Sequence, residues 1–201
     1  AASDVYKRQV LLSGAVIWAL MAPQPDVMIS GDGRNVAARG RDGRLHVMRS
    51  GKDAFLLKEW LAADADARLP TDASLTDGVS CDDVGCVMPM ADGRFVALTL
   101  HSKALADDCA RAVLIVTARQ VPSTCAASVI DRDRLRHQGA LMLKREPRGF
   151  SVQPARPRGT NRPWWPAAAD AGDFDSTLIM RAPERRSQDA TPPESEQQEE
   201  D

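Results

Sequence analysis

The side chains that could carry out chemistry are few in this chain of 201 residues, and they are widely spaced. Its three histidines are isolated: His46 falls inside an expected strand, His101 at a strand end, and His137 in a charged helix. Catalytic metal sites gather several imidazole and carboxylate ligands, whereas a lone His in these settings is more commonly structural or solvated. We therefore expect no metal, no other cofactor and no enzyme activity.

Two other kinds of reactive site are disfavoured by the local sequence. The segment GDGRNVAARG at 31–40 lacks the Gly-x-Gly-x-x-Gly order of a dinucleotide loop, and no helix follows directly, so hairpin turns explain its glycines better. No Gly-x-Ser-x-Gly elbow occurs. Cys109 and His101 are near in sequence, but Asp107 and Asp108 beside the thiol oppose a reactive thiolate.

The four cysteines permit three disulfide pairings. We favour Cys81 with Cys86 and Cys109 with Cys125, because each pair closes a short loop of turn-forming residues. Free buried thiols are one alternative. Zinc is another, although the four-residue gap in CDDVGC does not match common zinc spacings. Disulfides would indicate an oxidising compartment.

Apolar runs and turn signals alternate between residues 25 and 153 and predict one α+β domain with helices outside one or two sheets, an αββα-type order. Asp-Gly turns between the first runs predict an opening set of hairpins. Asp53 is placed to cap the first helix of this domain. We expect strands at 27–29, 36–38, 45–48, 86–90, 95–100, 113–116, 127–130, 140–143 and 150–152, and helices at 54–64, 102–111 and 131–139.

The ends of the chain differ from this domain. Residues 1–9 fit nothing that follows, and we interpret them as a non-native leader. The uncharged run at 10–22 is too short to span a membrane as it stands. It is either the apolar region of a secretory signal or the end of a transmembrane helix, and we prefer the latter because no small-x-small cleavage site follows. Residues 154–201 are rich in proline and charge, and we expect them to be disordered.

Charge is concentrated in one stretch, although the net charge is only −2. Residues 131–162 contain nine Arg or Lys residues and three Asp or Glu residues. Clustered positive charge is the general footprint of nucleic-acid binding, and a solvated face without a partner is the plainer alternative.

The order of these features resembles the C-terminal part of ComEC family competence proteins, over about residues 10–166. The resemblance is carried by the apolar run, PDVMISGDGRNVAARGRDGR, the first cysteine pair, VLIVTARQVPSTC, DRDRLRHQGAL and NRPWWP. In that family a multi-pass channel of the bacterial inner (plasma) membrane imports single-stranded DNA during natural transformation. Many members end in a metallo-β-lactamase-like domain. The resemblance implies this fold here, with the rest of the channel as partner. It also implies membrane attachment through residues 10–22. Cysteine usage places the soluble domain on the periplasmic side.

This chain departs from the family where catalysis would occur, because it lacks a clustered His-x-His-x-Asp-His motif. We therefore expect an incomplete or degenerate metallo-β-lactamase-like domain that assists DNA transport without catalysis. One alternative is an active metal-dependent nuclease or hydrolase with Asp32, Asp42 and His46 as ligands. Another is an exported, disulfide-bearing binding domain unrelated to competence. The candidate contacts to single-stranded DNA are Arg132, Arg134, Arg136, Lys144, Arg145 and Arg148.

Overall fold

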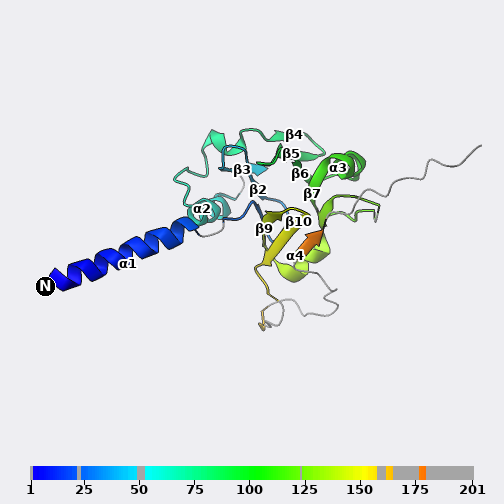
Figure 1. Cartoon of the computed structure of the whole chain (residues 1–201). Helices are drawn as coiled ribbons and strands as arrows, with labels where there is room; N and C mark the ends of the chain where they lie inside the picture. The colour runs from blue at the N-terminus through cyan, green and yellow to red at the C-terminus, as the bar shows by residue number, and fades with distance from the viewer. Residues whose placement is uncertain are drawn as a thin grey trace, which may run out of the picture.

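The chain is a mixed α+β protein, as the sequence pattern predicts (Figure 1). The computed structural model describes residues 2–21, 24–48, 53–122, 124–157, 162–164 and 177–179. Within these residues the strands form two sheets. The Asp-Gly signals predict the β1–β2 and β2–β3 turns of the first sheet and the β5–β6 turn of the second.

The first sheet has six strands in the order β11-β10-β9-β1-β2-β3, and all neighbours are antiparallel. The β1–β2 and β2–β3 turns place Gly33 and Gly43 at positive φ, a backbone conformation that favours glycine. The strands are β1 (Val27–Ile29), β2 (Val36–Arg39), β3 (Leu45–Met48), β9 (Leu141–Glu146), β10 (Gly149–Pro154) and β11 (Thr177–Ile179).

The second sheet has five strands in the order β4-β5-β6-β7-β8. Its first three strands are antiparallel, whereas β6, β7 and β8 are parallel. Parallel neighbours need a crossover connection, which helix α3 supplies between β6 and β7. The strands are β4 (Ser80–Cys81), β5 (Gly85–Pro89), β6 (Phe95–Thr99), β7 (Ala112–Thr117) and β8 (Ser128–Ile130).

The main core lies between the two sheets. Alternate residues of each strand point into it, so that Val27 and Ile29 are in this core while Met28 is in a separate cluster on the outer face. The second sheet contributes Val96, Leu98, Leu114 and Val116, among others. The facing inner surfaces therefore hold the two sheets together.

A helix packs on the outer face of each sheet. Helix α2 (Ala54–Ala63) is capped by the Asp53 carboxylate and buries Leu57 and Trp60 in the cluster on the first sheet. Helix α3 (Leu105–Arg111) contributes Cys109 to the cluster on the second sheet. Figure 1 shows α2 and α3 on opposite sides of the strands. The layers therefore run helix, sheet, sheet, helix.

Helix α4 (Arg132–Gln138) closes one end of this arrangement. The Asp131 carboxylate caps it by accepting the Arg134 N–H, and Gly139 ends it at positive φ. Leu135 is buried in the core between the sheets. The charged sequence of this helix is thus fixed to the fold by one apolar side chain and its caps.

Helix α1 (Ala2–Met21) runs without a break through the boundary between the expected leader at 1–9 and the apolar run at 10–22. Its Val10, Leu11 and Trp18 side chains are exposed. Among the described residues, no helix combines the length and the apolar character required to cross a bilayer.

Strand β11 lies inside the segment 154–201 that we expected to be disordered. It pairs with β10, and Leu178 is buried opposite Phe150. The expectation is therefore wrong for residues 177–179, because even a short segment without periodicity can extend a sheet edge through backbone hydrogen bonds. Residues 158–161, 165–176 and 180–201 of the expected tail lie outside the described residues.

Candidate functional site

The three candidate DNA contacts on α4 do not share one environment. Arg132 and Arg136 are exposed and lie one turn apart on the same face. Arg134 is buried, with 6% of its surface exposed, and its Nε donates a hydrogen bond to Gln138 Oε1 at 2.9 Å. The structure therefore corrects the expectation for Arg134, because the helical period turns this residue toward the protein interior.

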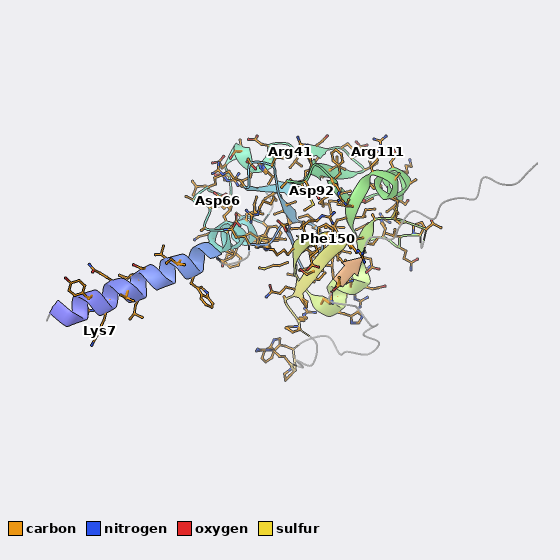
Figure 2. All side chains as sticks on the ribbon, in the orientation of Figure 1. Lys7, Arg41, Asp66, Asp92, Arg111 and Phe150 are labelled. Atoms are coloured by element: carbon orange, nitrogen blue, oxygen red, sulfur yellow. A yellow bond between two sulfur atoms is a disulfide. The ribbon has the colours of Figure 1, made fainter. Side chains whose placement is uncertain are left out.

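The candidate DNA contacts in the β9–β10 hairpin also differ in their exposure to solvent. Lys144 and Arg148 are exposed, whereas Arg145 is largely buried. Arg145 Nε lies 3.1 Å from Asp92 Oδ2, and its guanidinium stands 4.8 Å from the Phe150 ring centroid. Asp92 belongs to the β5–β6 turn, so this ion pair joins the two sheets; Asp92 and Phe150 are both labelled in Figure 2. Arg145 is therefore a structural residue. The expectation that it contacts DNA is corrected, as it is for Arg134.

The alternative metal ligands Asp32, Asp42 and His46 do not form one site. His46 Nε2 lies 3.0 Å from both carboxylate oxygens of Asp42, next to Gly40, where a Cβ would come within 2.9 Å of the imidazole ring. Asp32 lies in the turn at the other end of β2 and accepts hydrogen bonds from the Ser30 hydroxyl and the Arg34 N–H. Over the described ranges, no group of three or more His, Cys, Asp or Glu side chains could hold a metal ion.

Hydrogen bonds shift the acidity of Asp42. Burial alone raises its pKa, but hydrogen bonds from His46 and the Arg44 N–H, with the charge on His46, lower the pKa below the ordinary value of 3.8. His46 itself is 7% exposed, and its Nδ1 is buried without a partner among the described residues. The pair fixes the β2–β3 turn and favours the ionised form of the Asp42 carboxyl group.

We expect Asp42→Asn to destabilise the fold near neutral pH, and we expect this effect to shrink as the pH falls below about 3.8. A carboxylate whose pKa is lower in the folded state stabilises that state above its ordinary pKa of 3.8, and this contribution is lost as the pH falls through the folded pKa. Urea unfolding between pH 2.5 and 7 measures the effect. Asp83→Asn, at an exposed turn position, is the control and should show no such pH dependence. A gap between wild type and Asp42→Asn that stays constant with pH would contradict this prediction.

Two disulfides join Cys81 to Cys86 and Cys109 to Cys125. These are the two pairs that loop length favours. The first bridge links directly opposite residues of β4 and β5. The second ties α3 to the segment before β8, and Cys125 is buried on the outer face of the second sheet. Both bridges therefore stabilise the second sheet, the first at its antiparallel edge and the second on its outer face.

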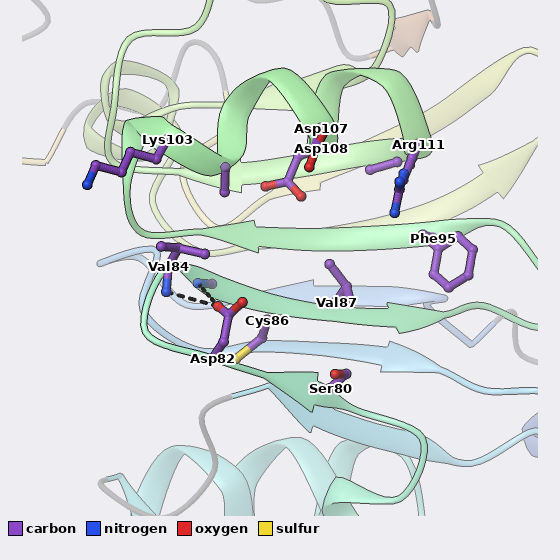
Figure 3. Close-up of a pocket in the computed structure, with 13 residues that line it drawn as sticks. Ser80, Asp82, Val84, Cys86, Val87, Phe95, Lys103, Asp107, Asp108 and Arg111 are labelled. Carbon is purple, nitrogen blue, oxygen red and sulfur yellow. Dashed lines mark hydrogen bonds between the residues drawn. The ribbon is translucent and has the colours of Figure 1, made fainter.

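A cavity of about 390 Å³ lies between α3 and the β4–β5 edge of the second sheet. Figure 3 shows Lys103 and Arg111 at opposite ends of this cavity, with Asp107 and Asp108 between them on the helix. Its floor includes Val87 and other small or apolar residues. The sequence offers no signal for this cavity, because its lining comes from segments that only the crossover brings together.

Two of the three carboxylates that line this cavity, Asp82 and Asp108, already have partners. Asp82 Oδ1 accepts hydrogen bonds from the Val84 and Gly85 N–H groups, drawn as dashed lines in Figure 3. Asp108 Oδ2 accepts one from the Thr99 hydroxyl. These bonds fix the β4–β5 turn and the position of α3, so the two carboxylates serve the fold.

Comparisons with protein-family models, with curated proteins and with solved structures found no match. The candidate interface therefore has to be judged from its residues. Arg132, Arg136, Lys144 and Arg148 are the sequence-predicted contacts that the structure leaves exposed.

Two further arginines lie next to α4 and were missing from the sequence-based set. Arg34 is exposed in the β1–β2 turn, and Arg156 follows β10. The hydrophobic and turn patterns place Arg34 in the opening hairpins, 98 positions before Arg132. Nothing in the sequence indicates that these hairpins lie next to the charged helix. Arg156 belongs to the basic run, but it stood in the segment expected to be disordered.

Proposed function

We propose that this chain is a domain of a membrane DNA-uptake protein of the ComEC type, and that it contacts single-stranded DNA without cleaving it. The observation that carries the proposal is the layer order of helix, sheet, sheet, helix, which fits the metallo-β-lactamase-like domain that the resemblance implies. Function does not follow from a fold alone, so the DNA role is argued from the exposed charges.

The turn residues support a role without catalysis. Asp32 and Asp42 stand in the turns where the resemblance places the start of the family's domain, and each accepts the N–H two residues further on. Asp42 also holds His46. These carboxylates thus stabilise hairpins, which is a structural use of the positions.

The disulfides support placement of the domain in the periplasm, because disulfides form and persist in oxidising compartments. In a DNA-uptake protein, a domain on this side would meet the incoming strand before the channel in the inner membrane does. The exposed arginines and lysines would then attract its phosphates.

The proposal predicts salt-dependent binding of single-stranded DNA. A labelled oligothymidylate is titrated with the full chain, and anisotropy is measured at several salt concentrations. Because each phosphate contact contributes about 0.7 to the logarithmic salt slope for single strands, the slope should fall by about 0.7 for each replaced cation that contacts a phosphate. The variant replaces four exposed cations by Ala: Arg132, Arg136, Lys144 and Arg148.

A matched control removes the same charge elsewhere and should keep most of the salt slope. It replaces exposed cations of other elements by Ala: Arg41, Lys58, Lys103 and Arg111. Equal losses in both variants would mean that net charge alone attracts the DNA. No binding by the unmodified chain at low salt would overturn the DNA role.

The runner-up is a metal-dependent nuclease or hydrolase; of its three expected ligands, His46 and Asp42 lie together and Asp32 lies in another turn. Metal analysis of the purified chain separates the two proposals. A stoichiometric pair of zinc or manganese ions would support the hydrolase and overturn a role without catalysis.

A further inference from the structure

We infer that single-stranded DNA binds at one surface around α4, where arginines from three segments meet; this inference rests on the proposed function. We call it the α4 surface and define it by four residues: Arg34, Arg132, Arg136 and Arg156. Two of them come from the helix, one from the β1–β2 turn, and one from the segment after β10.

The helix supplies a fixed pair of cations. Arg132 and Arg136 are four residues apart and both exposed, so their Cβ atoms stand about 5–6 Å from each other. A guanidinium binds phosphate oxygens through two parallel N–H groups. Two such groups on a single helix face can therefore engage separate phosphates of one strand.

The β1–β2 turn packs directly against this helix. A Cβ on Gly33 would lie 2.7 Å from Leu135 Cδ1, and one on Gly31 would lie 3.3 Å from the Ala140 nitrogen. The turn approaches this closely because it has glycines at both positions. Arg34 is exposed at the end of the turn, and its N–H is held by the Asp32 carboxylate. A residue remote in sequence is thus held beside α4.

Arg156 is held at the other end of α4. Its guanidinium donates to the Arg136 carbonyl oxygen at 2.8 Å, and its N–H donates to the Gln138 carbonyl oxygen at 2.9 Å. A Cβ on Gly139 would lie 3.4 Å from Arg156 Nε, so this glycine leaves room for the side chain. These bonds therefore hold the positive charge of Arg156 beside the C-terminal end of α4.

The acidic side chains near this surface are partly engaged. Asp32 accepts from the Ser30 hydroxyl and the Arg34 N–H, and Asp131 accepts from the Arg134 N–H. Asp133 is exposed. Hydrogen bonds from neutral donors leave a carboxylate charged, so the surface carries four guanidinium groups against three carboxylates, an excess of one positive charge. Its exposed arginines Arg34, Arg132 and Arg136 present hydrogen-bond donors to an anionic chain. This charge complementarity is what selects the DNA backbone as the occupant.

A pair of double variants tests the α4 surface. Arg34→Gln with Arg136→Gln removes two of its cations, whereas Lys144→Gln with Arg148→Gln removes two cations from the β9–β10 hairpin. With oligothymidylate as the probe, the first double variant should lower the logarithmic salt slope by about 1.4, and the second should leave it unchanged. Lysine at both positions of the first variant should restore the slope, because the charges return.

The outcomes separate this inference from the proposed function. If the unmodified chain binds and the hairpin variant loses as much slope as the α4 variant, or more, the α4 surface is not the binding surface and the DNA role stands. If the unmodified chain fails to bind at low salt, both are overturned. The thermal unfolding midpoint of each variant is measured. Should Arg34→Gln unfold the chain, the exposed pair Arg132→Gln with Arg136→Gln replaces it, with the same expected change in slope.

Discussion

Replacing Phe150 by Ala is expected to lower the free energy of unfolding by about 3–5 kcal/mol, because the substitution removes a fully buried aromatic ring and leaves a cavity. Phe150 lies in the core between the sheets, opposite Leu178 of the edge strand β11 and under the Arg145 guanidinium. Few neighbours can move into the vacated space, because the ring is enclosed by strands of both sheets. Urea denaturation monitored by circular dichroism gives the value from the midpoint and the slope.

Phe55→Ala is the matched control for this substitution. Phe55 is on α2 and is 74% exposed, so the same change of residue should alter the free energy of unfolding by no more than about 0.5 kcal/mol. Similar losses at the two positions would contradict the placement of Phe150 in the core. They would also remove the ring contact as support for the structural role of Arg145, and leave its ion pair with Asp92 as the support.

Loss of the Cys109–Cys125 disulfide should destabilise the fold by about 3 kcal/mol, and loss of the Cys81–Cys86 disulfide by about 2 kcal/mol. A cross-link restricts the unfolded chain more when it closes a longer loop, and the two sequence separations are 16 and 5 residues. Double Cys→Ala variants of each pair are compared in urea without reductant. The larger loss should appear at the bridge that ties α3 to the second sheet.

Reduction supplies the internal control for the disulfide prediction. With excess dithiol present, the unmodified chain should lose as much stability as the two double variants lose together. A larger loss at the shorter loop would contradict the loop-length argument. A chain that is unaffected by the dithiol would contradict the pairing itself, and with it the support for a periplasmic location.

Local signals along the sequence place most of the elements. The Asp-Gly pairs at 32–33, 42–43 and 92–93 each form the expected turn, with an N–H bonded to the Asp side chain and the Gly at positive φ. Asp53 and Asp131 cap the expected helices. These features are predictable because turns and caps depend on the residue itself and on its immediate neighbours.

The outcomes at Arg134 and Arg145 show why the candidate interface was less predictable. In the sequence, both belong to the same basic run as Arg132 and Lys144. The sequence does not show that α4 directs Arg134 toward Gln138, or that Asp92 of the other sheet meets Arg145. An arginine is a surface cation or an internal link depending on which carboxylate or amide the fold brings within hydrogen-bond distance.

Contacts over a few residues account for the α+β class, the hairpin turns, the helix caps and the favoured cysteine pairs, so the sequence alone predicts them. The three-dimensional fold was needed to learn which basic side chains are exposed, that β11 extends the first sheet, and that Arg34 lies beside α4. Burial and proximity depend on contacts between residues that are distant in sequence: 28 positions separate Phe150 from Leu178, 53 separate Arg145 from Asp92, and 102 separate Gly33 from Leu135. No periodicity, turn motif or local charge pattern encodes such contacts.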